Sequence, residues 1–336
     1  MKLLLLTLLT SAAAAEEKPL VHTLRMASIA PDGTGYAREM RAFAREVEGE
    51  SFGRLKVKLY FGAIAGDELE MDARVKRGQL DGAASAGMMC ERLAPSMRVM
   101  RMPGLFANRD EATQVLGRLK PIVDPEFQKA GYMNLGLVMV GPAIIFSRYA
   151  TNTLEELRKQ RFWAWDADRM MQRLFPMFGL NTVLMPIYEA ARAYDEGRHD
   201  GFTGPPSAAL AFQWSSRARY FIELDLAYIT GCVVISTTAW DSLPEELRTV
   251  VRSAMAKAAA RLTEVDRELD RQLVDKLFAK QGLKRLPVTP GLRADFERLA
   301  KSARAELIKG DDVPAATVEK VQAMIDVGRI QRSTHK

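Results

Sequence analysis

Two tryptophans are the side chains of this sequence best suited to holding a ligand. Trp163 and Trp165 are separated by Ala164 in a predicted strand, so both indoles leave the same strand face. An indole offers a large apolar surface and one N–H donor. The same stretch closes with Gly204 and Pro205 after a predicted strand, where open α/β sheets place their ligands. On composition alone, however, two tryptophans on one strand face are more often ordinary core.

The residues that usually perform catalysis or bind metals are not arranged for it. His22, His199 and His335 do not have metal-ligand spacing, and neither Cys90 nor Cys232 has a CxxC partner. The sequence also lacks a GxSxG motif, a P-loop and a GxGxxG motif after a strand. We therefore expect a binding protein rather than an enzyme, with no cofactor and no metal.

Four acidic residues, Asp67, Glu68, Glu70 and Asp72, lie close together and could suggest a paired-carboxylate site. They also stand at the start of a predicted helix, where acidic side chains interact favourably with the positive end of the helix dipole. The helix start is the better explanation of this cluster.

The N-terminus has the composition of a signal peptide. Lys2 precedes an apolar run at 3–9, and the ending Ala13-x-Ala15 predicts cleavage before Glu16. The apolar run is shorter than the roughly 20 residues of a membrane span, which leaves a transmembrane or cytosolic protein as the weaker alternative. Because no cysteine follows the run, we expect a soluble periplasmic protein without a lipid anchor.

Length and charge indicate two lobes and argue against nucleic acid as a partner. The chain has 336 residues, more than the roughly 250–300 that one hydrophobic core serves. Lys and Arg number 48 against 42 Asp and Glu, a net charge of +6, and the two signs are interleaved. In an oxidising compartment Cys90 and Cys232 could form a disulfide. Because free cysteine is commonly buried, we expect two small buried hydrophobic side chains instead.

Strand and helix patterns alternate along the chain, which predicts an α/β fold with parallel strands and right-handed crossovers. The first unit predicts strands at 23–28, 55–60 and 80–85, with helices at 36–48 and 67–77. The tryptophan stretch predicts strands at 157–165, 182–185 and 200–202, with helices at 169–178 and 189–196. Apolar positions at helical spacing from Pro244 to about Leu277 predict one long helix.

Six segments, in order and spacing, resemble the substrate-binding proteins of tripartite ATP-independent periplasmic (TRAP) transporters, the DctP-type family. They are TLRMASIAPDGTGYAREMRAFAREVE, GRLKVKLYFGAIAGDELEMDARVKRGQLDGA, MRMPGLFANRDEA, GLNTVLMPIYEAARAYDEGRHDGF, SSRARYF and WDSLPEELRTVV. The resemblance implies a two-lobe periplasmic binding protein fold with intertwined lobes, a central cleft and a long C-terminal bracing helix. It also implies integral membrane TRAP permease subunits as partners, and an additional periplasmic protein is a further candidate.

This organisation divides the chain into four parts. Residues 1–15 form the signal peptide, 16–140 mostly lobe I and 141–230 mostly lobe II. Residues 231–336 hold a returning strand, the long helix that spans both lobes and the C-terminal helices.

The departures from the family pattern concern the ligand. A strand-borne arginine that commonly forms a two-pronged salt bridge with a ligand carboxylate aligns with Trp163. A second frequent arginine aligns with Ala143, and a frequent asparagine aligns with Gly204. A one-residue slip would bring Arg161 nearer the motif, but it would also turn that side chain to the other strand face.

A cleft without a cation disfavours a desolvated carboxylate, which needs a charged hydrogen-bonding partner. We therefore predict an apolar or amphipathic ligand such as a lipid, sterol, terpenoid or aromatic compound. The candidate ligand-binding residues are Trp163, Trp165, Ala143, Ile145, Phe146, Met185, Ile187, Phe202, Gly204, Pro205, Ser85, Leu105, Phe106 and Pro31. For each apolar wall residue taken singly, a place in the lobe core is an equally good explanation.

Two other hypotheses stay open at this point. The ligand could be a small organic acid, with Arg74, Arg148 or Arg169 supplying a displaced cation. Alternatively, the chain could be a scaffold or sensor domain that has kept the fold and lost its ligand.

Overall fold

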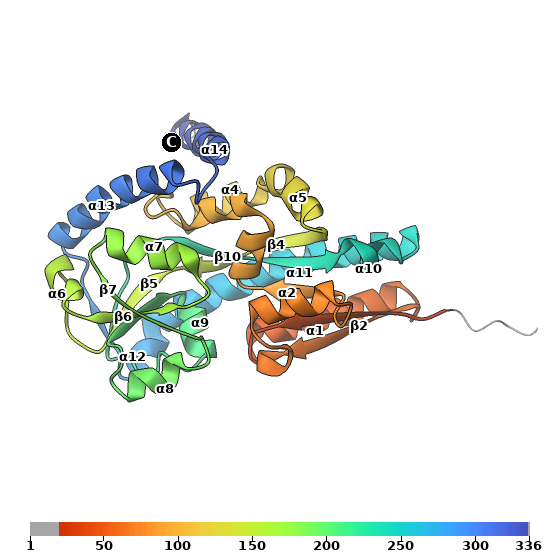
Figure 1. The fold of residues 1–336 in the computed structure, drawn as a ribbon, viewed down its shortest axis with the longest axis horizontal. Helices are drawn as coiled ribbons and strands as arrows, with labels where there is room; N and C mark the ends of the chain where they lie inside the picture. Colours follow the sequence, from red (N-terminus) through yellow and green to blue (C-terminus); the bar gives the residue numbers. More distant parts are fainter. Residues whose placement is uncertain (1–19, 335–336) are drawn as a thin grey trace, which may run out of the picture.

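The computed structural model describes residues 20–334, which build two lobes on two sheets (Figure 1). Lobe I is built on a five-stranded sheet of order β2-β1-β3-β10-β4, and lobe II on a six-stranded sheet of order β11-β9-β5-β8-β6-β7. The chain enters lobe I, crosses to lobe II after β4, returns for β10 and crosses again before β11. The predicted signal peptide lies outside the described residues.

The elements of the first passage through lobe I are β1 (His22–Ser28), α1 (Gly35–Glu50), β2 (Leu55–Phe61), η1 (Gly62–Ala65), α2 (Glu68–Lys76), β3 (Gly82–Ser85), α3 (Met88–Leu93), η2 (Pro95–Arg101), α4 (Arg109–Gly117), α5 (Lys120–Lys129) and β4 (Tyr132–Pro142). Those of lobe II are β5 (Ile144–Ser147), α6 (Leu154–Arg158), β6 (Arg161–Trp165), α7 (Arg169–Met177), β7 (Asn181–Met185), α8 (Ala190–Asp195), β8 (Gly201–Gly204), α9 (Pro206–Ala211) and β9 (Tyr220–Ile222). The remaining elements are β10 (Tyr228–Ser236), α10 (Thr237–Asp241), α11 (Glu245–Gln272), η3 (Leu273–Leu277), α12 (Phe278–Lys280), β11 (Lys284–Leu286), α13 (Pro290–Lys309) and α14 (Ala315–Thr334).

Both sheets are mixed, whereas the strand–helix alternation predicts parallel pairing. β1 pairs in parallel with β2 and β3, and β6 with β7 and β8, as predicted. The strands that arrive from the other passage of the chain, β10 in lobe I and β5 in lobe II, pair antiparallel with their neighbours. Their direction depends on distant crossovers, which local patterns do not encode.

In each lobe, an arginine on one strand binds the aspartate that immediately precedes a neighbouring parallel strand. The guanidinium of Arg25 on β1 donates to both carboxylate oxygens of Asp81, at 2.9 and 2.8 Å. Arg161 on β6 donates in the same way to both carboxylate oxygens of Asp200, each at 3.0 Å. A glycine follows each aspartate. A Cβ on Gly201 would lie 2.8 Å from a carbonyl oxygen of the adjacent β5 strand, so the Asp-Gly pairs serve close strand packing.

The pairing of Arg161 with Asp200 also shows that Arg161 does not take the place of the family's ligand-binding arginine, which aligns with Trp163. Arg161 is half exposed and engaged with Asp200, so its side chain is fixed at the start of the strand. The start of this segment departs from prediction, because residues 154–158 form the short helix α6 and the strand begins only at Arg161. The hydroxyl of Thr153 caps that helix by accepting a hydrogen bond from the N–H of Glu156. A threonine at this position indicates a helix start, and the strand prediction did not take it into account.

The predicted long helix is α11, which begins after the N-cap Pro244 and braces both lobes. It runs behind the sheets from α10 to α12 and contacts α1, β4 and α9 (Figure 1). Near the lobe crossing, Asp270 of α11 accepts hydrogen bonds from Arg109 at 2.8 Å and from the N–H of Ser207 at 2.7 Å. This carboxylate thereby joins α4 of lobe I to α9 of lobe II.

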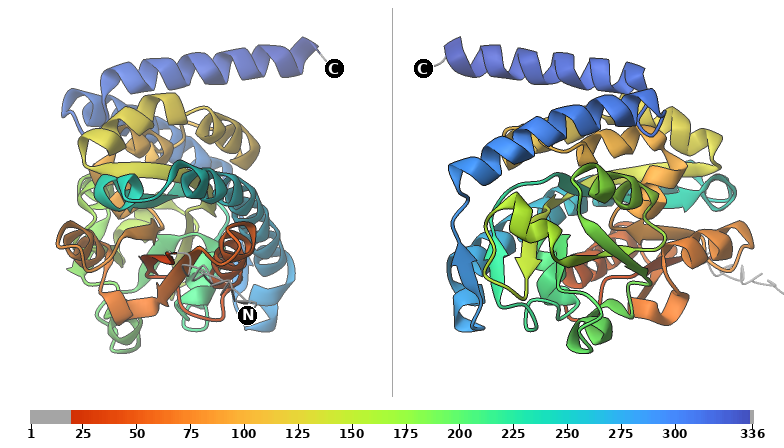
Figure 2. Two further views of the ribbon diagram at one scale, coloured as in Figure 1. Left: turned by 90° about the vertical axis from the view of Figure 1, so that its right-hand side faces the viewer. Right: turned by 60° about the vertical axis from the view of Figure 1, so that its left-hand side comes forward.

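Two C-terminal helices cover the same side of the molecule. Helix α13 packs on α6 and α7 of lobe II, and α14 packs on α4 and η2 of lobe I. Figure 2 shows α14 lying across this side as a straight rod. Each lobe therefore receives a late helix, which adds to the intertwining of the chain.

The two cysteines form a disulfide, so the expectation of two unpaired buried side chains is wrong. Cys90 on α3 and Cys232 on β10 are bonded, with their Cα atoms 5.8 Å apart. β10 lies beside β3, with Cys232 opposite Ser85, and α3 follows β3 directly. This non-local strand pairing brings together residues 142 positions apart in the sequence.

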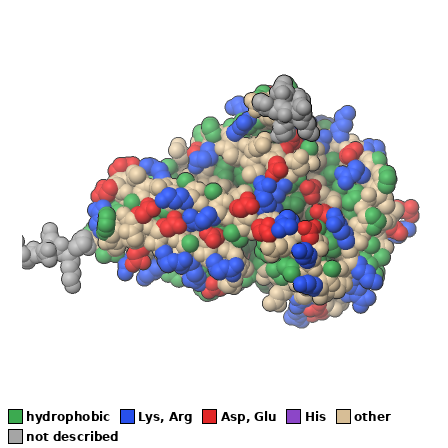
Figure 3. Space-filling view, turned by 180° about the vertical axis from the view of Figure 1, so that it is seen from behind, with side chains coloured by type: hydrophobic (Ala, Val, Ile, Leu, Met, Phe, Trp, Pro, Cys, Tyr) green, Lys and Arg blue, Asp and Glu red, His purple; other side chains and the backbone are tan. Residues whose placement is uncertain are grey.

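The surface supports the charge argument made from composition. On the face in Figure 3, Lys and Arg alternate with Asp and Glu rather than gathering in a single-sign patch. Among the described residues, no helix combines the length and apolar composition that a membrane span needs.

Candidate ligand-binding cleft

A cavity of about 140 Å³ lies between the lobes, at the carboxyl ends of several strands. Lobe I contributes the segments after β1 and β3, and lobe II contributes β6 and the segment after β8. Its walls include Ile29, Gly87, Met88, Val140 and Ile229 from lobe I, and Ala143, Trp163, Trp165, Ile187, Gly204, Pro205, Phe212 and Trp214 from lobe II. Apolar side chains dominate this lining.

Trp163 presents its ring to the cleft but not its hydrogen-bond donor. The indole is 7% exposed and packs edge-on against Trp214, with ring centroids 4.9 Å apart. Its Nε1 donates to the carbonyl of Met185 at 3.1 Å. Because that bond joins β6 to its neighbour β7, Trp163 is both a cleft wall and a part of the lobe II core.

Trp165 lies on the same side of β6 and also lines the cleft. It is half-buried and packs against the apolar clusters of both lobes. Its Nε1 is buried and has no hydrogen-bond partner among the described residues. A buried N–H without a partner is costly, so this donor is available to a polar atom of a ligand.

Arg101, at the end of η2, is the cation of the cleft lining, and the sequence analysis missed it. Its guanidinium donates to both oxygens of Glu91 at 3.1 and 3.0 Å, and to Asp168 at 2.6 Å. Arg101 and Glu91 belong to lobe I, whereas Asp168 caps α7 of lobe II. The Arg101–Asp168 ion pair therefore spans the cleft.

Burial opposes the charges of this ion-pair cluster. Burial is the largest influence on Arg101 and lowers its pKa, but Asp168 and Glu91 together outweigh it and leave that pKa raised. Burial raises the pKa of Glu91 to about 7, against the opposing effect of Arg101. Arg101 is only 4% exposed, so an anion that approaches it meets a cation already matched by two carboxylates.

A third carboxylate in the lining holds the cleft backbone. Glu68 is 1% exposed and accepts the N–H groups of Ala86 and Met89, both at 2.8 Å. Burial raises its pKa. The neighbouring Asp67 caps α2 through the N–H groups of Leu69 and Glu70, as the helix-start explanation predicts. The acidic cluster is thus structural, and Glu68 also places a carboxyl group in the cleft lining.

The structure brings six of the fourteen candidate residues together in the cleft lining: Trp163, Trp165, Ala143, Ile187, Gly204 and Pro205. Pro31 lines an adjoining groove, and Ile145 lines a separate apolar cavity in lobe II. The other six are buried and do not line the cleft: Phe146, Met185, Phe202, Ser85, Leu105 and Phe106. Phe106 also borders a groove formed by segments of both lobes.

The arginines considered as displaced anchors lie outside the cleft lining. Arg74 pairs with Glu70 at 3.0 Å along α2. Arg148 stacks over the ring of Tyr194, 4.2 Å from its centroid, and donates to the Tyr194 carbonyl. Arg169 is exposed at the start of α7. The one sequence signal for Arg101 was a charged residue inside an apolar run just before Pro103.

Histidine has a structural role in lobe II. His199 is 1% exposed, and its ring nitrogens lie 3.2 Å from the carbonyl of Gly201 and 2.8 Å from that of Ala190. Burial lowers its pKa. Within the described residues, no group of three His, Cys, Asp or Glu side chains is arranged to hold a metal ion.

The two-lobe fold and the cleft between the lobes define a solute-binding protein. The family model of the bacterial extracellular solute-binding proteins, family 7 (DctP), matches residues 26–311, and the chain belongs to this family. The family resemblance drawn from the sequence is thereby confirmed.

Three similar proteins share a quarter or less of their aligned residues with this chain. An uncharacterized protein of Haemophilus influenzae is 25% identical over 282 residues, covering 82% of this chain and 83% of the relative. A solved receptor of Bordetella pertussis that binds pyroglutamic acid has a TM-score of 0.83 at 20% identity, covering 91% of this chain and all of that one. The sugar acid binding protein of Advenella mimigardefordensis, solved with galactonate, has a TM-score of 0.85 at 18% identity, covering 92% and 99%. The ligands of these solved proteins are acids, so they give no support to the expected apolar ligand.

Proposed function

We propose that this protein is the periplasmic receptor of a TRAP-type secondary transporter and delivers its solute to integral membrane permease subunits. The family membership and the cleft between two lobes support this role. Ligand contacts made by both lobes would shift the protein toward a closed form. The Arg101–Asp168 pair, which joins the lobes across the cleft, would contribute to that form.

For the solute, we propose an apolar or amphipathic molecule with one or two polar groups. The observation that carries this proposal is the pairing of the charged groups in the cleft lining. Its cation, Arg101, already has two carboxyl partners, Glu91 and Asp168, and Glu68 places a third carboxyl group in the lining. An apolar body would gain roughly 25 cal/mol for each Å² buried against the tryptophan-rich wall. The Trp165 N–H would donate a hydrogen bond to one polar atom of the ligand.

A small organic acid is the second candidate, and two observations favour it. The solved relatives bind acids, among them pyroglutamic acid and galactonate. Arg101 also has a buried Nε without a partner among the described residues, so its Nε–H could donate a hydrogen bond to a further oxygen. A carboxylate ligand would then compete with Asp168 for the guanidinium or require a proton on Glu91, whose pKa is raised to about 7.

Native mass spectrometry of protein purified without denaturation, followed by solvent extraction, tests the proposal. A co-purified apolar molecule supports the first candidate. Tight binding of small carboxylates in calorimetry, abolished by Arg101→Gln, would establish the second. A protein that binds neither class would favour the scaffold or sensor hypothesis.

A substitution at the centre of the tryptophan wall adds a sharper probe. Trp163→Arg places a cation where the family commonly has one, and Tyr188→Arg adds the same charge at a position 72% exposed. Carboxylate affinity that appears only in the first variant supports the assignment of Trp163 to the ligand site. Unchanged apolar binding in both variants would contradict it.

A further inference from the structure

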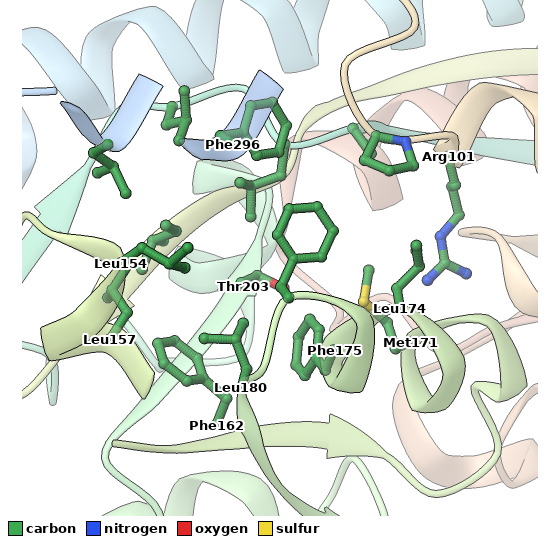
Figure 4. Close-up of a pocket in the computed structure, with 17 residues that line it drawn as sticks. Arg101, Leu154, Leu157, Phe162, Met171, Leu174, Phe175, Leu180, Thr203 and Phe296 are labelled. Carbon is green, nitrogen blue, oxygen red and sulfur yellow. The ribbon is translucent and has the colours of Figure 1, made fainter. Parts of the chain in front are cut away.

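A second cavity lies in lobe II, behind the cleft, between the sheet and the helices α6, α7 and α13. Its volume is about 70 Å³, and 15 of its 17 lining residues are apolar. Figure 4 shows Leu154, Leu157, Phe162 and Phe296 around it, with Arg101 at one end. Apolar cavities accept apolar groups, as a ~150 Å³ cavity that binds benzene illustrates.

The cavity and the cleft share a wall of four residues: Arg101, Met171, Phe175 and Thr203. Arg101 and Thr203 are also the two polar side chains of the cavity lining, so its polar end faces the cleft. Met171 is half-buried, and an unbranched thioether side chain moves between rotamers at low cost. A shift of Met171 would therefore connect the two spaces.

We propose that this cavity is a subsite for the alkyl end of the solute bound in the cleft. This proposal rests on the proposed function and specifies the class of ligand. The ligand would be a single-chain amphiphile whose polar end stays in the cleft near Trp165 and Arg101. The volume is about half that of the benzene-binding example, which limits the inserted part to a short straight or branched chain.

A homologous series of probes tests the subsite directly. Calorimetry with n-alkanols and n-alkanoic acids of about four to about ten carbons should show affinity rising about fourfold for each added methylene, until the cavity is full. Both head groups are included because the chain-length dependence is the readout and does not depend on which polar end the cleft prefers.

Two phenylalanine substitutions on α13 provide the matched comparison. Leu292 lines the cavity and is 3% exposed, whereas Leu299 lies two turns further along the helix, is half-buried and does not line it. Leu292→Phe should abolish the gain with chain length and leave the affinity of the shortest probes unchanged. Leu299→Phe should keep the full gain. Equal chain-length dependence in the two variants overturns the proposal.

A second variant covers the case in which Leu292→Phe does not fold. Met171→Phe closes the shared wall at a half-buried position and should reduce the affinity of the long probes at least tenfold. Unchanged affinity for the long probes overturns the proposal. If the wild-type protein binds a co-purified solute but shows no gain with chain length, the subsite fails while the proposed receptor function stands.

Discussion

The substitution Asp266→Asn should remove a pH dependence built into the long helix. Asp266 lies on α11, is 6% exposed and faces the groove between α9 and the segment after β1. Burial, reinforced by the nearby charge of Asp270 and opposed by Arg109, raises the pKa of Asp266 to about 8 from an ordinary 3.8. Asparagine has nearly the same shape and cannot ionise, so it isolates the effect of the charge.

The direction and size of the effect follow from proton linkage. Between about pH 4 and pH 8 the folded chain keeps a proton on Asp266 that the unfolded chain has released, so the free energy of unfolding falls as pH rises. Each pKa unit corresponds to about 1.4 kcal/mol, so the loss amounts to at most about 6 kcal/mol. Raised pKa values of Asp270 and Glu91, to about 6 and about 7, add losses of the same sign. The difference between the variant and wild type removes these shared contributions.

Urea unfolding of both proteins across this pH range measures the prediction. The free energy of unfolding of Asp266→Asn minus that of wild type should increase by several kcal/mol as pH rises from about 4 to about 8. It should level off above that range. A difference that stays constant across the range would refute the assignment of a buried, protonated Asp266.

Three further predictions concern the disulfide, the interlobe ion pair and strand packing. Replacing Cys90 and Cys232 by alanine opens a loop of 142 residues and should lower the free energy of unfolding by about 4–5 kcal/mol. An equal melting temperature of the wild-type protein with and without reductant would contradict this. Asp168→Asn should weaken the buried pair with Arg101 and raise the population of the open form. Small-angle scattering of the variant without ligand should then show a larger radius of gyration than wild type. An unchanged radius would contradict an interlobe role of this ion pair. Gly201→Ala should destabilise lobe II by more than about 2 kcal/mol in thermal unfolding, because its Cβ would lie 2.8 Å from a β5 carbonyl oxygen, and a neutral effect would show that the strands can separate.

Local patterns predicted the elements of the fold well where their signals lie within a few residues. The alternation of strands and helices and the long helix after Pro244 are present as expected. The strand predicted at 157–165 was wrong in its first residues, because Leu157 belongs to the buried side of the short helix α6 and the strand begins at Arg161. Strand direction and the disulfide depend on β10, which returns from the far end of the sequence.

The candidate site was predictable only in part. The family comparison directed attention to Trp163, Ala143 and Gly204, which the structure places in the cleft lining. It could not reveal Arg101, because an arginine in a largely apolar run gives no sign of its partners. Glu91 and Asp168 are 10 and 67 positions away from it, and only the folded chain brings these three charges together.

The central claim is that an apolar body, and not an ion pair with the solute, holds the ligand in this cleft. A crystal structure of the protein with its co-purified solute tests this most directly. We predict an apolar group packed against Trp163 and Phe212, with Arg101 still paired to Glu91 and Asp168. A ligand carboxylate bound to Arg101 in place of Asp168 would contradict the claim.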